Sequence, residues 1–309
     1  MSRTALQAAW SRLPPTLRGI GWAALAGILF SLQNVLMRMV TLDVHPFVVC
    51  FWRYFFGALA LAPVILGGGA GVLRVRRAGN HLLRSAVHTV GLGLWFYALP
   101  LIPIAETTAL GFTTPLFITL GAIFVLREQV GLRRIVAVAL GFVGMLIILR
   151  PGLAEVSQGS LLMLISAPLF AVSNLMTKLA AREDSVTAIV AWQSVLITLM
   201  CLPAALLVWE TPSLTQFLWL VLGGALGTAG NLALSQSYKV ADIAAVQPIG
   251  FLTLVWAALL GFAIFDDEPD LWTWVGAAVI FAANTYISHR ELVRRGRSDL
   301  SGDTPPPAH

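Results

Sequence analysis

Long apolar runs separated by short polar segments dominate the chain. Each run holds about 20 residues with few charges, the length that an α-helix needs to cross the hydrocarbon core of a bilayer. The pattern therefore predicts an all-α integral membrane protein with ten transmembrane helices. The predicted spans are 19–40, 46–66, 83–100, 103–126, 131–149, 159–180, 187–208, 214–237, 242–264 and 272–289.

Composition agrees with this reading. Of the 309 residues, 58% are hydrophobic and 11% are charged, whereas about a quarter of the residues of a soluble domain are charged. The composition argues against a soluble enzyme or a nucleic-acid binder. The net charge of +5 would suit nucleic acid, but the basic residues flank apolar spans, so we expect a lipid bilayer and no nucleic acid as partner.

The basic residues also predict the orientation. Sixteen of the 20 lysine and arginine residues lie on the side of the N-terminus, and only Arg150 lies in a loop on the other side; Arg38, Arg53 and Lys178 fall inside spans. Cytoplasmic loops carry such an excess, so both termini should be cytoplasmic. Residues 1–18 form a cytoplasmic N-terminal segment, and residues 290–309, which end in SGDTPPPAH, should form a disordered cytoplasmic tail.

An internal repeat appears at a shift of 140 residues. The segment FSLQNVLMR (30–38) aligns with FAVSNLMTK (170–178), which pairs Asn34 with Asn174. This predicts two repeats, 19–149 and 159–289, with five helices each. Five is odd, so the second repeat must enter the membrane from the opposite side. Inverted repeats are typical of secondary transporters, which bind solute between the repeats and expose it alternately to each side.

The closing segments of the two halves, TTPLFITLGAIFVLRE and LVWAALLGFAIFDDE, resemble the EamA domains of the drug/metabolite transporter superfamily. The stretches FYALPLIPIAETTALGFTTPLF and GFVGMLIILRPG resemble, more narrowly, its bacterial branch of riboflavin and S-adenosylmethionine uptake carriers. The resemblance implies a multi-pass protein of a bacterial inner membrane, in which helices 1, 3, 4, 6, 8 and 9 enclose the cavity. FDDE stands where the family usually has F-G-E. Other members of the superfamily export amino acids and related metabolites, which is the alternative function.

Charged residues within spans are costly and need a reason. Arg53 lies about seven residues into the second span, roughly 10 Å below the outer surface, and Glu106 opens the fourth span from the same side. The two could form an ion pair, or Arg53 could meet a carboxylate or phosphate of the solute. Glu106 could instead interact with the helix dipole. We expect Arg38, at the outer end of the first span, to extend to the membrane interface.

The remaining candidate solute contacts are polar or aromatic. Asn34 and Asn174 could bridge helices or bind solute. Thr113, beside Pro115, and Gln247, beside Pro248, mark interrupted helices in the two halves, which point to a site near the midplane. Trp95, Tyr97 and Trp256 could stack on a flat or cationic solute, although packing is the alternative for each.

These features favour a secondary transporter of a small polar organic metabolite, such as a vitamin or nucleoside-like solute. An intramembrane enzyme would need a concentrated set of histidines and carboxylates, and a channel would need rings of charge or a carbonyl filter; the spans show neither. The sequence predicts no cofactor and no metal, and it leaves a homodimer open. Cys50 and Cys201 lie in apolar runs and should be buried small residues.

Overall fold

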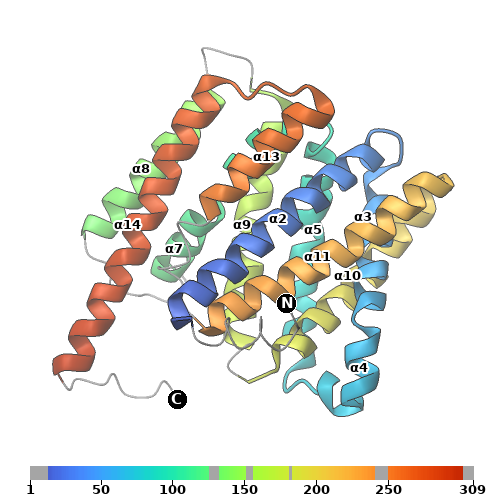
Figure 1. The fold of residues 1–309 in the computed structure, drawn as a ribbon, viewed down its shortest axis with the longest axis horizontal. Coiled ribbons are helices and arrows are strands. Elements are labelled where there is room, and N and C mark those ends of the chain that lie inside the picture. Colours follow the sequence, from blue (N-terminus) through green and yellow to red (C-terminus); the bar gives the residue numbers. More distant parts are fainter. Residues whose placement is uncertain (1–12, 125–131, 151–155, 181–182, 241–249, 302–309) are drawn as a thin grey trace.

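The fold is a helical bundle, seen in a computed structural model that describes residues 13–124, 132–150, 156–180, 183–240 and 250–301. The described residues contain helices and connecting turns and no strand (Figure 1). The elements are α2 (Pro15–Thr41), α3 (Pro46–Ala60), α4 (Ala62–Gly68), η1 (Ala70–Leu73), α5 (Ala78–Ala98), α6 (Ile104–Gly111), α7 (Thr114–Phe124), α8 (Leu132–Leu149), α9 (Gln158–Ala180), α10 (Val186–Leu207), α11 (Leu214–Val240), α13 (Gly250–Phe265) and α14 (Leu271–Ser301).

Several of these helices are long and apolar enough to cross a membrane. Among the described residues, five stretches meet this criterion by length and composition: Pro15–Thr41, Pro46–Gly67, Gln158–Thr177, Val186–Leu207 and Leu214–Leu234. Two shorter apolar helices cover Ile135–Leu149 and Leu252–Phe265. The chain is therefore an all-helical protein with the composition of a membrane protein.

Two predicted spans are divided into two helices each. The second span ends one helix at Ala60 and starts another at Ala62, next to Pro63. The fourth span breaks between Gly111 and Thr114, just before Pro115, which cannot donate the backbone hydrogen bond that a continuous helix needs. Interruption of the fourth span, predicted from this proline, is confirmed.

The ends of two other helices differ from the sequence prediction. Helix α5 begins at Ala78 instead of residue 83. Helix α14 continues to Ser301, so residues 290–301 are helical where a disordered tail was predicted. The segment ELVRR consists mostly of good helix formers, which can extend a helix that is already nucleated.

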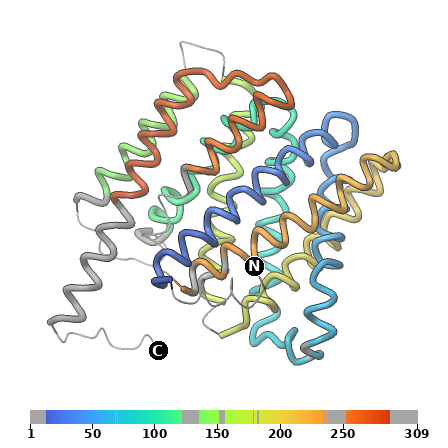
Figure 2. Tube along the Cα trace, viewed as in Figure 1, coloured from blue at the N-terminus to red at the C-terminus, as the bar shows by residue number. Residues whose placement is uncertain are grey.

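The packing of the helices relates the two halves of the chain. Helix α2 packs along α11, and α5 packs along α9; Figure 2 shows the first pair as the blue and orange tubes side by side. The two pairs are equivalent in the repeat, because a shift of 140 residues relates α2 to α9 and α5 to α11. The pairs α2–α13 and α9–α7 are related in the same way, whereas α3–α10 and α8–α14 each pair a helix with its own repeat partner.

Two of these interfaces contain small side chains. A Cβ atom on Gly144 of α8 would lie 2.7 Å from the carbonyl oxygen of Gly276 of α14, so only glycine permits this crossing. At the α3–α10 interface, Cys50 and Cys201 are buried and unbridged, with their sulfur atoms 3.1 Å apart. Their predicted burial is confirmed. We call the end of the bundle at which α2 begins the inner end and the opposite end the outer end.

Candidate functional site

Helix α2 has one apolar exposed face and an inner face opposite to it. Leu25, Ile28 and Leu32 are exposed and recur at the spacing of one helix face. Asn34 lies on the opposite face and is half-buried. Phe30, one turn before it, shares this inner face and is also half-buried. Asn34 therefore points into the bundle, away from the face that fits lipid.

Helix α9 repeats this arrangement. Leu161, Ile165, Val172 and Leu179 form its exposed apolar face. Asn174 lies on the opposite face and is nevertheless exposed. Because an amide is costly to expose to hydrocarbon, its exposure on this side fits a water-accessible space within the bundle. The structure thus places Asn34 and Asn174 on corresponding inner faces.

Aromatic rings accompany these amides. On α2 the ring of Phe30 packs on Gly230 of α11, where an added Cβ would lie 2.8 Å from the ring. On α9 the ring of Phe170 packs on Gly91 of α5, where an added Cβ would lie 3.2 Å from the ring. These glycines let each ring lie close to the neighbouring backbone. The i, i+4 pairing of Phe with Asn in both repeats was visible in the sequence, but only the structure assigns it to the inner faces.

Helix α5 adds His88 and Trp95 to the site. Both are half-buried and lie opposite the exposed Leu83 and Val90. His88 Nδ1 lies 3.0 Å from the hydroxyl of Ser173, and its ring centroid lies 5.0 Å from that of Phe170. His88 is thus bonded to α9 inside the bundle. Trp95 packs against both large apolar clusters.

Arg53 has a different partner from the one predicted. Its Nη2 donates to Oε1 of Gln33 at 3.0 Å, and its guanidinium carbon lies 4.0 Å from the ring centroid of Tyr54. The residue is only 8% exposed. It lies where α3 meets α2 and α11, so the predicted ion pair with Glu106 is wrong. The apolar pattern gives the position of a residue along its helix, but it does not specify which neighbouring helix the side chain contacts.

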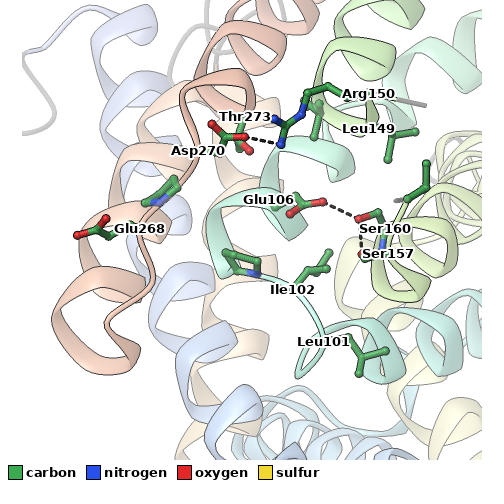
Figure 3. A pocket seen from close by; sticks show the side chains of 14 residues that line it. Leu101, Ile102, Glu106, Leu149, Arg150, Ser157, Ser160, Glu268, Asp270 and Thr273 are labelled. Carbon is green, nitrogen blue, oxygen red and sulfur yellow. Dashed lines mark hydrogen bonds and ion pairs between the residues drawn. The ribbon is translucent and has the colours of Figure 1, made fainter. Parts of the chain in front are cut away.

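Glu106 lines a pocket at the outer end (Figure 3). The pocket has a volume of about 270 Å³ and is bounded by α6, α8, α9 and the segment before α14. Ser160 donates to Oε1 of Glu106 at 2.6 Å, and Arg150 pairs with Asp270 across the pocket. Glu106 is therefore separate from the inner-face residues.

The other predicted contacts fall in several places. The hydroxyl of Thr113 is buried and donates to the carbonyl of Leu110 at 2.7 Å, which satisfies a backbone group at the α6–α7 break. Tyr97 lies on the exposed face of α5 and its hydroxyl is 2.7 Å from Nε2 of His45. Trp256 is 38% exposed beside exposed leucines of α13. Gln247 lies outside the described residues.

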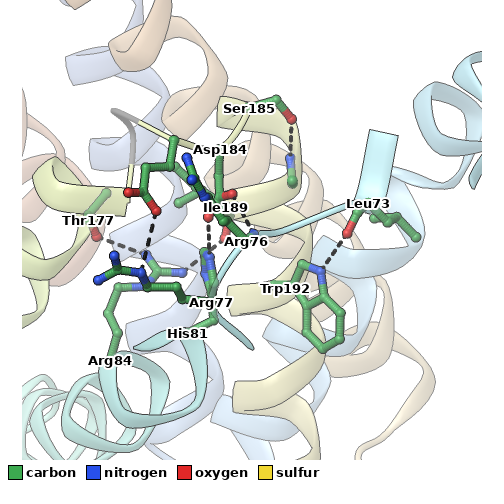
Figure 4. A network of polar contacts seen from close by, with 12 residues as sticks. Leu73, Arg76, Arg77, His81, Arg84, Thr177, Asp184, Ser185, Ile189 and Trp192 are labelled. Carbon is green, nitrogen blue, oxygen red and sulfur yellow. Dashed lines mark hydrogen bonds and ion pairs between the residues drawn. The ribbon is translucent and has the colours of Figure 1, made fainter. Parts of the chain in front are cut away.

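A polar network at the inner end was missed by the sequence analysis (Figure 4). Arg84 of α5 is 1% exposed and donates to the Thr177 hydroxyl at 2.8 Å, to Gln193 Oε1 at 3.2 Å and to the Ile189 carbonyl at 3.0 Å. It ties α5 to α9 and α10. Its place in an Arg-rich stretch made it indistinguishable from the cytoplasmic charges that orient the chain.

Asp184 anchors the same network from the loop after α9. Its carboxylate oxygens lie 2.8 Å from His81 Nε2 and 2.9 Å from the backbone nitrogen of Arg76. Burial raises the pKa of this carboxyl, but the hydrogen bonds from His81 and Arg76 outweigh it and leave the pKa below its usual value. Because the pKa of Asp184 is lower in the folded protein than in the unfolded chain, its charge stabilises the fold at any pH above the pKa of the unfolded chain. This stabilisation is lost as the pH falls through the pKa of the folded protein.

Asp184→Asn should therefore lower the thermal stability at pH 7 by a few degrees in Tm. The difference from the parent should shrink as the pH falls below about 4. Melting curves of the detergent-purified proteins between pH 3 and pH 7 measure this. A difference that is constant over this range would show that the charge of Asp184 does not stabilise the fold.

Among the described residues, no group of three His, Cys, Asp or Glu side chains gathers to hold a metal ion. In the part of the chain that the structure describes, the functional groups of the interior are amides, hydroxyls, rings and the buried guanidinium groups of Arg38, Arg53 and Arg84. Together with the apolar exterior, they define a membrane protein with a polar interior, the class that contains solute transporters.

The chain matches the EamA-like transporter family twice, over residues 17–150 and 157–288, and it belongs to that family. The S-adenosylmethionine uptake transporter of Rickettsia bellii is 29% identical over 88% of this chain and 94% of its own. The riboflavin transporters of Rhizobium johnstonii and Vibrio cholerae are 35% and 33% identical, over 89% and 91% of this chain and 92% and 96% of theirs. A solved crystal structure with a TM-score of 0.62 and 19% identity, over 91% of this chain and 98% of its own, shares the fold.

Proposed function

We propose that the chain imports a metabolite with a heteroaromatic ring system, of the class that includes S-adenosylmethionine and riboflavin, across a bacterial inner membrane. The observation that carries this proposal is the pairing of an amide with aromatic rings on the inner faces of both repeats: Phe30 with Asn34, and Phe170 with Asn174. The similar proteins named above support the substrate class, since they are transporters of S-adenosylmethionine and of riboflavin.

The chemistry of the inner faces suits such a solute. Aromatic side chains stack on flat rings, and Phe30, Trp95 and Phe170 provide them. An asparagine side chain offers a donor and an acceptor side by side, which matches the edge of a heteroaromatic base. Arg53 lies on α3, and its guanidinium donates a hydrogen bond to Gln33 of α2. We therefore propose that it holds α3 against α2 and does not contact solute.

The architecture that fits this function is ten membrane-spanning helices arranged as two inverted repeats, residues 19–149 and 159–289. The symmetric helix pairing supports it, because α2–α11 exchanges with α5–α9, α2–α13 exchanges with α7–α9, and α3–α10 and α8–α14 each convert into themselves when the halves are exchanged. Alternating access follows from such a repeat, because the two halves can exchange conformations around one site. Both termini are cytoplasmic in this arrangement.

Uptake by proteoliposomes tests the substrate class. Purified protein should accumulate radiolabelled S-adenosylmethionine or riboflavin with saturable kinetics, and unlabelled compound should compete. Trp95→Ala should reduce the uptake about fivefold, because stacking on one ring contributes about 1 kcal/mol. If neither compound enters faster than into empty liposomes, the proposed substrate class is wrong.

A further inference from the structure

Arg38 lies directly outward of the site. It is one helical turn beyond Asn34 on the same inner face of α2, and the whole residue is 8% exposed. Its guanidinium contacts both carboxylate oxygens of Asp267, with Nη2 3.2 Å from Oδ1. The guanidinium carbon also lies 4.4 Å from the ring centroid of Phe265. The predicted extension of Arg38 to the membrane interface is wrong, because Asp267 holds it inside the bundle.

Asp267 connects this arginine to a third segment. Its Oδ2 accepts a hydrogen bond from the backbone nitrogen of Ile104 at 3.4 Å, where α6 begins. Its own backbone nitrogen donates to the carbonyl of Gly261 at 3.2 Å, which fixes the loop after α13. One carboxylate thus joins the outer ends of α2 and α6 to the loop between α13 and α14.

An apolar cluster closes the space around the ion pair. Val35, Ile104 and Ala257 are 3%, 0% and 0% exposed, and they come from α2, α6 and α13. Met39, Leu260 and Phe265 pack against them. Water is therefore excluded at the outer end of these three helices, where solute would have to pass to reach Asn34 from outside.

The two ends of the bundle differ at the repeat-related amides. Asn34, toward the outer end, is half-buried, whereas Asn174, toward the inner end, is exposed. The residues that correspond to Arg38 and Asp267 in the other repeat are Lys178 and Arg127. Both are cations, so the sequence of the other repeat does not repeat this pairing of opposite charges.

We propose that Arg38 and Asp267 form the outer gate of the transport path, and that the structure shows the state closed to the outside. This inference rests on the proposed transport function. The pair has to separate for solute to enter from outside, and separation returns both charges to water. Removal of either partner leaves an unpaired buried charge, which destabilises the closed state and favours the outward-open state.

Thiol labelling from outside tests the gate. The parent carries Cys50→Ala and Cys201→Ala, and Asn34→Cys serves as the reporter. Intact cells are treated with a charged, membrane-impermeant thiol reagent. Arg38→Ala and Asp267→Asn should each increase the labelling rate of the reporter about tenfold or more. The double exchange Arg38→Asp with Asp267→Arg should return the rate to within about twofold of the parent.

A matched control breaks another ion pair at the same end. Arg150→Ala removes the Arg150–Asp270 pair, which lies across the pocket beside α8 and not at α2, and it should leave the labelling rate unchanged. Asp267→Asn preserves the shape of the side chain and its acceptor toward Ile104, so it tests the charge even where Arg38→Ala fails to fold. Parent-like rates in Asp267→Asn, or equal acceleration by Arg150→Ala, would overturn the gate.

The labelling needs no solute, so it is independent of the substrate assignment. Absence of S-adenosylmethionine and riboflavin uptake, together with accelerated labelling in the gate variants, would remove the substrate class and retain the gate. Intact uptake with unchanged labelling would remove the gate alone.

Discussion

Asn174→Leu should lower the initial rate of uptake about thirtyfold while the protein remains folded. The substitution replaces a donor and an acceptor on the inner face of α9 with a side chain of similar volume. Leaving the polar groups of a bound solute unpaired costs roughly 2 kcal/mol, which corresponds to this factor. Uptake into proteoliposomes at limiting solute concentration measures it, and gel filtration in detergent reports folding.

Val172→Ala is the matched control for this prediction. Val172 is two residues away on the same helix but lies on its exposed apolar face, so uptake should stay within about twofold of the parent. Equal losses in the two variants would indicate that α9 tolerates no change, and parent-like uptake by Asn174→Leu would exclude this amide from the site. Asn34→Leu should behave as Asn174→Leu does if the two repeats contribute alike.

Gly276→Leu should affect stability and not solute binding, in contrast to Asn174→Leu. We expect a large loss of stability and an unchanged affinity for solute. A Cβ on Gly276 would meet the carbonyl oxygen of Gly144 and the side chain of Ile148. The contact with backbone cannot relax, so α8 and α14 must separate. Overpacking of this kind costs about 3 kcal/mol, and thermal unfolding in detergent should show a Tm lower by roughly 5–10 °C.

Gly67→Ala provides the comparison. A Cβ on Gly67 of α4 meets no atom within 4 Å, so the Tm should not fall. The fraction of Gly276→Leu that remains folded should bind solute with parent-like Kd, because α8 and α14 contribute none of the inner-face residues. A Tm equal to that of the parent would contradict the close α8–α14 crossing.

The sequence predicted the helices well and their lateral neighbours poorly. Apolar runs of membrane length located the α-helices among the described residues, with most of their ends within a few positions, because the hydrophobic period is a strong local signal; the short η1 lies outside the predicted spans. The end of α14 was missed, because charged helix formers carry no apolar signal.

The site shows the same division. Asn34 and Asn174 were singled out because the repeat places them at equivalent positions, and the structure gives both an inner-face location. Arg53 was expected to pair with Glu106, but its bond to Gln33 depends on how α2 and α3 are rotated, which no hydrophobic run specifies. Arg84, His88 and the Arg38–Asp267 pair were missed or misassigned, because their partners are 85 to 229 residues away in sequence.

Counterflow in proteoliposomes tests the central claim of a carrier with alternating access. Liposomes containing purified protein are loaded with unlabelled S-adenosylmethionine or riboflavin and diluted into a trace of the labelled compound. We expect a transient accumulation of label above equilibrium, because one site is exposed alternately to each side. Entry of label that never exceeds equilibrium, at a rate that does not saturate, would contradict a carrier.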